Sequence, residues 1–148
     1  MSSFFGKIEA RLDAKGRVFV PAAFRRLLGV GEHLSVVLRK DFYEDCLVIY
    51  PKTSWEALLA DVRSKLNPYK REHNALLRNL VAEAEELELD SQGRMLLQKR
   101  FLQHIGSESD VIFVGEIDKI TLWAKTKHEK NALSSVDFAE QLGGVMNA

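Results

Sequence analysis

The same turn sequence occurs twice in the chain: residues 12–20 read LDAKGRVFV, and residues 89–97 read LDSQGRMLL. Each copy places an Asp three residues before a Gly-Arg pair and continues directly into apolar residues. An Asp side chain can accept hydrogen bonds from downstream backbone amides, and Gly tolerates a positive φ. Both copies therefore predict a tight turn that leads into a strand.

The similarity extends beyond the turn. With a shift of 77 residues, seven of the 21 positions from 9 to 29 are identical to positions 86 to 106. A second match, between residues 52–56 and 125–129, needs a shift of 73, because the loop 39–46 is longer than its counterpart. Two copies of one structural unit are therefore predicted.

Hydrophobic periodicity predicts the elements of the first unit. Residues 7–12 alternate apolar and charged side chains, which is typical of a strand with one buried face. Residues 17–20 continue as a strand, and we expect the two to form a hairpin around the turn. Pro21 then opens a short helix that ends at Gly29, and residues 34–38 and 47–50 are predicted as two further strands.

Longer helices follow the strands of each unit. Thr53-x-x-Glu56 and Thr126-x-x-Glu129 both match the capping-box pattern of a helix start. The first of these helices is expected over residues 55–66, with a break at Asn67-Pro68 and a further helix over residues 71–85.

Composition limits the class of protein. The 148 residues are 46% hydrophobic and 28% charged, which suits a folded domain, and no apolar run reaches the ~20 residues that span a bilayer. We therefore expect a cytoplasmic protein. Cys46 is the single cysteine and is predicted to be a buried structural thiol. Four short strands cannot bury both faces in so small a unit, so the two units should pair around a pseudo-two-fold β-rich core.

No catalytic or metal site is predicted. The four histidines show no ligand spacing, and they are His33, His73, His104 and His128. Asp13 and Asp90 could form a carboxylate pair, but each has an Arg four residues later that would keep it ionised. A hydrolase using the two aspartates would also need a nucleophile or a bound metal. We expect no enzyme activity, no cofactor and no small-molecule substrate.

Charge distinguishes the two copies, although the chain as a whole has 21 basic and 21 acidic residues. Residues 7–29 hold six basic and two acidic residues, a net charge of +4, whereas residues 84–106 hold three basic and four acidic residues, a net charge of −1. A local charge of +4 favours phosphate contacts, and a solvated charge cluster is the alternative. The residues predicted to contact DNA are Arg11, Lys15, Arg17 and Arg25; those predicted to build the turns are Asp13, Gly16, Asp90, Gly93 and Arg94.

These motifs resemble those of the MraZ family of bacterial proteins with tandem SpoVT-AbrB-like repeats. The resemblance rests on residues 12–21, on the Phe-Arg-Arg-Leu-Leu helix after them and on the second Leu-Asp-x-x-Gly-Arg copy, and it covers essentially the whole chain. The second copy departs from the family pattern, with Gln98-Lys99-Arg100 where the family typically has Pro. We therefore expect the second turn and helix to present themselves differently from the first.

The resemblance implies an α+β fold of two AbrB-like βαβ-type repeats, with a β-barrel-like core and peripheral helices. Residues 5–54 and 84–127 would be the repeats, residues 55–83 a helical connector, and residues 128–148 a C-terminal helix and tail. It also implies a nucleoid-associated regulator that forms a ring and binds double-stranded DNA at repeated promoter boxes of the division and cell-wall gene cluster, without a membrane partner. The alternative is a ring-forming protein-interaction scaffold without DNA specificity.

Overall fold

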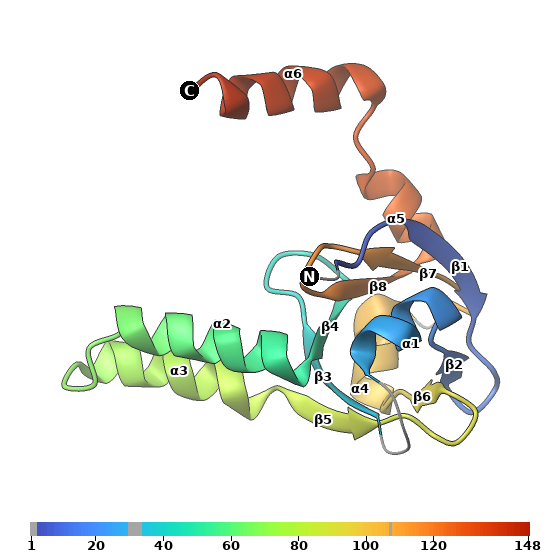
Figure 1. Ribbon diagram of the computed structural model, residues 1–148, viewed down its shortest axis with the longest axis horizontal. Helices are drawn as coiled ribbons and strands as arrows, with labels where there is room; N and C mark the ends of the chain where they lie inside the picture. The colour runs from blue at the N-terminus through green and yellow to red at the C-terminus, as the bar shows by residue number, and fades with distance from the viewer. Residues whose placement is uncertain (1–2, 30–33, 107) are drawn as a thin grey trace.

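The computed structural model describes residues 3–29, 34–106 and 108–148, and its architecture is α+β (Figure 1). The first unit contains β1 (Lys7–Arg11), β2 (Arg17–Phe19), α1 (Ala22–Leu28), β3 (Ser35–Lys40), β4 (Leu47–Pro51), α2 (Lys52–Lys65) and α3 (Arg71–Ala82). The second unit contains β5 (Glu85–Glu88), β6 (Arg94–Leu96), α4 (Lys99–Ile105), β7 (Asp110–Gly115), β8 (Ile120–Ala124), α5 (Lys125–Asn131) and α6 (Ser135–Met146). The order of elements is the same in both units, as the repeat predicts.

The two units share one sheet. Six strands lie in the order β1-β7-β8-β4-β3-β5, and β2 pairs with β6 in a separate two-stranded ribbon. Exchanging the units maps this order onto itself, because β1 corresponds to β5, β3 to β7 and β4 to β8. The predicted pairing between units is confirmed by the antiparallel pairs β1·β7, β3·β5, β4·β8 and β2·β6.

The six-stranded sheet is open. Among the described strands, β1 and β5 each have a single neighbour in the sheet and lie at its opposite edges. The expected barrel-like closure is therefore not seen. The core is instead enclosed between the inner face of this sheet, the β2·β6 ribbon and the short helices α1 and α4 (Figure 1).

The expected hairpin between residues 7–12 and 17–20 is wrong. β1 pairs along its whole length with β7, from Lys7 opposite Val114 to Arg11 opposite Asp110. β2 leaves the plane of the sheet after the turn and pairs with β6. The second unit offers β1 a longer partner than the three-residue β2. The turn is closed by backbone hydrogen bonds from Asp13 N to Arg17 O at 2.9 Å and from Gly16 N to Asp13 O at 3.0 Å.

The larger of two hydrophobic clusters in the described residues joins both units. Phe24 from α1 and Phe101 from α4 occupy equivalent positions and are 2% and 1% exposed. They lie in one cluster with Phe113 from β7 and with Val18 and Met95, which point inward from the ribbon. Each unit therefore contributes side chains to a core that neither encloses alone.

The capping-box predictions are also wrong. β4 and β8 run directly into their helices, so α2 begins at Lys52 after Pro51, and neither α2 nor α5 has a side-chain cap. Thr53 consequently lies inside the first turn of α2. The hydroxyl of Thr126 donates a 2.7 Å hydrogen bond to Glu108 instead of capping its own helix.

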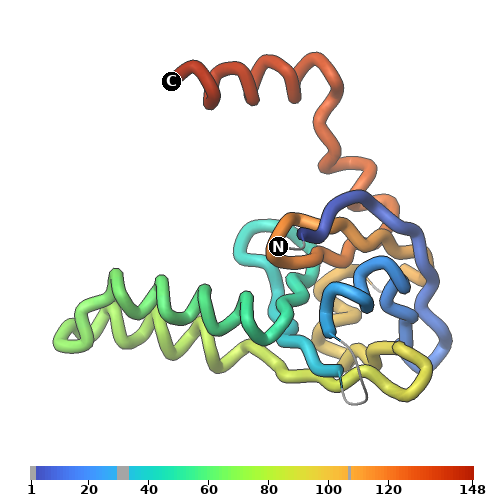
Figure 2. The backbone as a smooth tube through the Cα atoms, viewed as in Figure 1, coloured from blue at the N-terminus to red at the C-terminus, as the bar shows by residue number. Residues whose placement is uncertain are grey.

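Two helical parts extend from the body of the protein (Figure 2). α2 and α3 form a helical hairpin whose base packs on β3 and β4 through Trp55 and Leu58. The predicted break at Asn67-Pro68 is confirmed as the tip of this hairpin, where Asn67 Oδ1 accepts a 2.9 Å hydrogen bond from Tyr69 N. α6 extends separately after α5.

Cys46 immediately precedes β4 and is 1% exposed, so the prediction of a buried thiol is confirmed. Burial raises the pKa of this thiol far above its usual range. In the described part of the chain, no helix has both the length and the apolar character needed to cross a membrane.

Replacing Phe113 by Ala tests the shared core. Phe113 is 0% exposed, and we expect Phe113→Ala to lower the free energy of unfolding by about 3–5 kcal/mol, because it removes a buried ring and leaves a cavity. Phe5→Ala is the matched control, since Phe5 is 81% exposed and should change stability by less than about 0.5 kcal/mol. Urea unfolding measures the free energy of unfolding of both variants. Because the two units share core residues, each variant should unfold in a single transition.

Candidate nucleic-acid interface

The first turn is held by the Asp13 carboxylate. Its Oδ1 accepts hydrogen bonds from the backbone amides of Lys15 and Arg17, both at 2.9 Å. Its Oδ2 accepts a 2.7 Å hydrogen bond from Nε of Arg17, which also forms the ion pair. Gly16 has φ 84°, in the left-handed region where a side chain is strained. The motif thus fixes the backbone and the guanidinium group together.

The second turn repeats this geometry. Asp90 accepts from the amides of Gln92 and Arg94 at 2.9 Å and from Nε of Arg94 at 2.7 Å, and Gly93 has φ 82°. In both turns the backbone amide of the Arg is the main cause of a lowered carboxyl pKa. Each Asp is therefore ionised at neutral pH and occupied by hydrogen bonds, which leaves it unsuited to proton transfer.

The two turns lie at opposite ends of the β2·β6 ribbon. Val20 N donates to Gly93 O at 3.0 Å, and Leu97 N donates to Gly16 O at 2.9 Å, so each strand ends on the turn of the other unit. The β2·β6 ribbon therefore connects the two turns, and this ribbon lies at the junction of the two units.

The outer face of the ribbon consists of Arg17 and Phe19 from β2 and Arg94 and Leu96 from β6, and we call these four residues the ribbon face. In the register Arg17 lies opposite Leu96, and Phe19 lies opposite Arg94. The two arginine Cα atoms are therefore roughly 8 Å apart, from the rise along a strand and the spacing between strands. Phe19 and Leu96 lie diagonally across the ribbon and are 53% and 54% exposed, so this face combines two apolar side chains with two arginines.

Both arginines present unoccupied donors. Each bonds its Asp through Nε, and neither pair of terminal nitrogens has a hydrogen-bond partner among the described residues. The surroundings differ, however. The guanidinium of Arg94 lies 5.7 Å from the centre of the Phe19 ring, whereas the cross-strand neighbour of Arg17 is Leu96. The side chain of Arg17 is 31% exposed and that of Arg94 is 20% exposed.

The short helices cross over to the opposite turns. Arg25 of α1 donates from Nη1 to the Gln92 carbonyl oxygen at 3.2 Å and lies over Gly93, in contact range of any Cβ there. Its counterpart in α4 is Leu102, whose Cδ1 would lie 3.0 Å from a Cβ on Gly16. Each turn is thus covered by the helix of the other unit.

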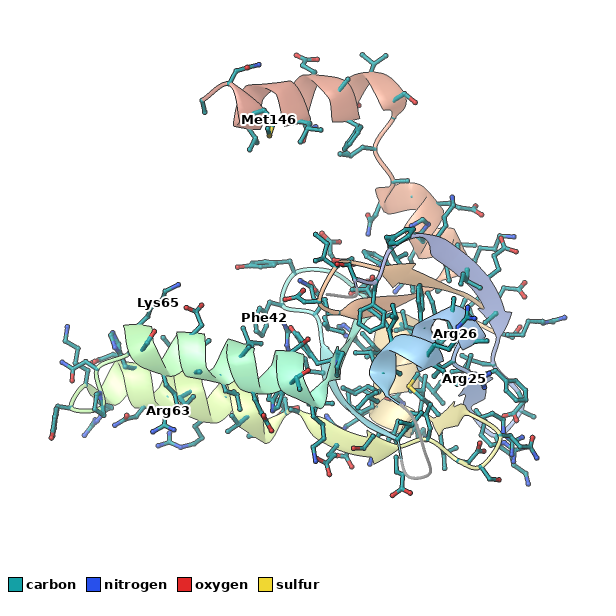
Figure 3. The ribbon with its side chains drawn as sticks, viewed as in Figure 1. Arg25, Arg26, Phe42, Arg63, Lys65 and Met146 are labelled. Atoms are coloured by element: carbon teal, nitrogen blue, oxygen red, sulfur yellow. The ribbon has the colours of Figure 1, made fainter. Side chains whose placement is uncertain are left out.

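This crossing corrects the predicted basic patch. Residues 7–29 have a net charge of +4 in sequence, but Arg25 lies at the second turn, and Arg25 and Arg26 project from α1 (Figure 3). Arg11 lies on the edge strand and forms a 3.3 Å ion pair with Asp110 of β7. Of the four residues predicted to contact DNA, only Lys15 and Arg17 therefore share the first turn. The Lys15 side chain is exposed and has no partner in the part of the chain that the structure describes.

Sequence reasoning missed Phe19 and Leu96 as members of the surface. The alternation in Arg17-Val18-Phe19 contained the signal, because Val18 is buried and its two neighbours must share the opposite face. For the metal question, residues 3–29, 34–106 and 108–148 contain no group of three His, Cys, Asp or Glu side chains suited to an ion. His33 lies outside these residues.

Comparison with known proteins agrees with the doubled architecture. A family model described as "MraZ protein, putative antitoxin-like" matches the chain twice, over residues 4–79 and 80–141. The chain belongs to the MraZ family. A Bacteroides fragilis relative named transcriptional regulator MraZ is 42% identical over 146 residues, covering 99% of this chain and 92% of the relative. Relatives of the same name from Bacteroides thetaiotaomicron and Lachnoclostridium phytofermentans are 40% and 36% identical over 147 and 134 residues, covering 99% and 90% of this chain and 94% and 90% of those proteins.

The charge of Asp13 should stabilise the MraZ-family turn only above acidic pH. Its pKa is lowered on folding, so the stabilisation is present above the unfolded value of about 3.8 and is lost as the pH falls through the folded-state pKa. We expect Asp13→Asn to unfold at lower urea concentration than the parent at pH 7, and the difference to shrink towards pH 3. Asp118→Asn is the control, because Asp118 has only a 3.9 Å contact with Lys119. A difference that stays constant with pH would contradict the role of the charge.

Proposed function

We propose that this MraZ-family chain is a transcription regulator that contacts double-stranded DNA with the ribbon face and the first turn. The observation that carries the proposal is the guanidinium group of Arg17 on the exposed ribbon: Asp13 fixes it through Nε, and its terminal nitrogens have no hydrogen-bond partner among the described residues. A two-stranded β-ribbon fits the major groove, and paired guanidinium donors suit guanine or phosphate oxygens. The names of the relatives, transcriptional regulator MraZ, support the same role.

In this proposal the two arginines have different roles. Arg17, more exposed and without an aromatic neighbour opposite it, reaches a base edge or a phosphate. Arg94 is engaged with both Asp90 and the Phe19 ring and mainly stabilises the second turn. Because Asp13 fixes the Arg17 side chain beforehand, little rotamer freedom is lost when DNA binds.

The other basic residues near the ribbon contact DNA phosphates in this proposal. Lys15 projects from the first turn and Arg11 from the neighbouring edge strand, so both contact the backbone on one side of the ribbon. Arg25 adds a positive charge beside the second turn, on the other side. Such contacts set the register of a protein on DNA without reading its sequence.

One chain has only a few basic residues at the proposed interface and no net charge overall, so we propose that the protein binds DNA as a ring. Several copies would engage repeated promoter boxes at once, and avidity would supply the affinity that one copy lacks. The boxes would be those of the division and cell-wall gene cluster, and the protein would act in the cytoplasm at the nucleoid. The second candidate function is a ring that serves as a scaffold for an acidic protein partner. The exposed apolar side chains of Phe19 and Leu96 support a protein contact as well as they support a DNA contact.

Substitution of the two arginines distinguishes their roles. We expect Arg17→Ala to weaken binding to DNA from upstream of the gene by about 10- to 100-fold, the value of one good side-chain contact. Arg94→Ala should retain most specific binding and should instead lower the urea midpoint. Fluorescence anisotropy with promoter and scrambled DNA measures both. Equal losses of binding in two folded variants would contradict the division of roles, and unchanged binding in both would contradict the interface.

Replacing Lys15 by Ala tests its phosphate contact. The variant should weaken binding to promoter and scrambled DNA alike and should reduce the dependence of log K on log salt concentration by about one unit. Lys130→Ala, on α5, should change neither quantity. Salt-independent binding of the parent protein, or equal affinity for promoter and scrambled DNA, would favour the scaffold.

A further inference from the structure

α6 has no packing partner among the residues that the structure describes. None of its residues is buried, and it extends from the body after the segment 132–134 (Figures 1 and 2). Helices of this length are marginal in water unless an apolar face packs against something. A stable α6 therefore needs a surface that the chain itself does not provide.

The exposed apolar side chains of α6 lie along one stripe. At 100° per residue, Phe138, Leu142, Val145 and Met146 fall within an arc of about 100°, and Met146 points towards the side on which the α2–α3 hairpin lies (Figure 3). Their exposed fractions are 54%, 46%, 73% and 74%. Asp137, Glu140 and Gly144 occupy the opposite side. Such a stripe is typical of a helix that docks into a groove.

The internal repeat shows which surface α6 lacks. By its place in the order of elements, α6 is the counterpart of α3, and α3 packs on the 14-residue α2 with Leu80 buried. The counterpart of α2 is α5, which has seven residues and is tied to the body by ion pairs of Lys125 with Glu9 and Lys127 with Asp45. α5 is too short to accept α6 as α2 accepts α3.

A groove of suitable character lies at the base of the α2–α3 hairpin. It encloses about 350 Å³ and has Trp55, Leu59 and Val81 in its lining. Val81 is 43% exposed, so part of this apolar lining is open to solvent. Lys52 and Glu86, which form a 3.1 Å ion pair, also line the groove.

We propose that α6 of one copy docks into the α2–α3 groove of a second copy of this chain. The internal repeat favours this occupant, because α6 is the counterpart of α3 and α3 packs on α2. The groove is itself lined by Lys52, Glu56 and Glu86, and the two elements as wholes have opposite net charges. Residues 133–148 contain two acidic and no basic residues, whereas residues 52–82 contain six basic and three acidic residues, a net charge of +3. The hairpin and α6 of one chain thus carry opposite charges on separate elements, and α6 does not reach the hairpin of its own chain in the structure.

The geometry of this contact determines the type of assembly. α6 and the groove are different surfaces, so each copy donates one helix and accepts one, and such a head-to-tail contact generates a closed ring or an open filament. A stable interface buries about 800 Å² per partner, and a copy within a ring makes the contact twice. The inference gives a physical basis to the ring in the proposed function, but it does not require that the ring bind DNA.

Two substitutions on α6 test the stripe in the absence of DNA. Leu142→Asp places a charge within the stripe and should convert the assembly to single chains, as measured by light scattering after size-exclusion chromatography. Val136→Asp is the matched control: Val136 is 74% exposed on the same helix but about 130° away from the stripe centre, so the assembly should persist. An assembled Leu142→Asp variant, or a parent protein that is already monomeric at working concentration, would overturn the proposal.

A mixing experiment identifies the acceptor. Val81→Asp, in the groove, should also give single chains, whereas an α6–α6 contact would leave that variant assembled. Mixed in equal amounts, Leu142→Asp and Val81→Asp chains should form heterodimers and no larger species, because one intact helix meets one intact groove. A mixture that stays monomeric would overturn the groove assignment. Circular dichroism and the urea midpoint verify that each variant folds. Removal of residues 133–148 deletes α6 altogether and should also give single chains, without introducing a new charge on the helix.

Affinity for a single promoter box separates this inference from the proposed function. A monomeric Leu142→Asp variant that retains affinity for one box but loses the gain on repeated boxes supports both. A variant that becomes monomeric when the parent shows no specific DNA binding supports the helix-in-groove contact and contradicts the DNA-binding proposal.

Discussion

The pairing of strands between the two units is the interaction on which the rest of the structure depends. β1 has β7 as its partner, β5 has β3, and β4 meets β8 at the centre, so each unit completes the sheet of the other. The β2·β6 ribbon exists only because of the same exchange. The candidate interface therefore lies where the two units join, and a change that separates the units would remove the interface and the core together.

The turn motif combines a structural and a chemical role in one carboxylate. Asp13 and Asp90 use three hydrogen bonds each to hold a backbone turn and one guanidinium nitrogen, and the remaining nitrogens of the Arg stay available. The motif itself is the same in both copies, to within 0.1 Å in these bonds. Differences between the copies come from neighbours, such as the ring of Phe19 against the aliphatic side chain of Leu96. Duplication thus preserved the scaffold of the turn and left its chemistry free to diverge.

Much of the fold could be predicted from sequence, because periodicity and the repeated turn report local structure. Alternation in residues 7–12 shows that a strand buries one face, but it does not specify the partner, and the expected hairpin with residues 17–20 was wrong for this reason. Thr53 matched a cap pattern, yet tertiary context joined β4 directly to α2. Charge counted along the sequence grouped Arg25 with the first turn, whereas α1 crosses to the second turn and carries Arg25 with it. Long-range pairing decides all three, and no local pattern contains it.

The symmetry of the core also constrains how copies can associate. The internal two-fold maps the backbone of the six-stranded sheet onto itself and that of the ribbon onto itself, so the strand order is the same from either end. A head-to-tail contact needs two different surfaces, and the chain provides them only where the units differ: a long α2 with α3 packed on it, and a short α5 followed by a free α6. The proposed head-to-tail contact therefore depends on the asymmetry of the helices outside the core. Because the ribbon face and these helices lie on separate elements, substitutions can test the proposed DNA contact and the proposed assembly independently.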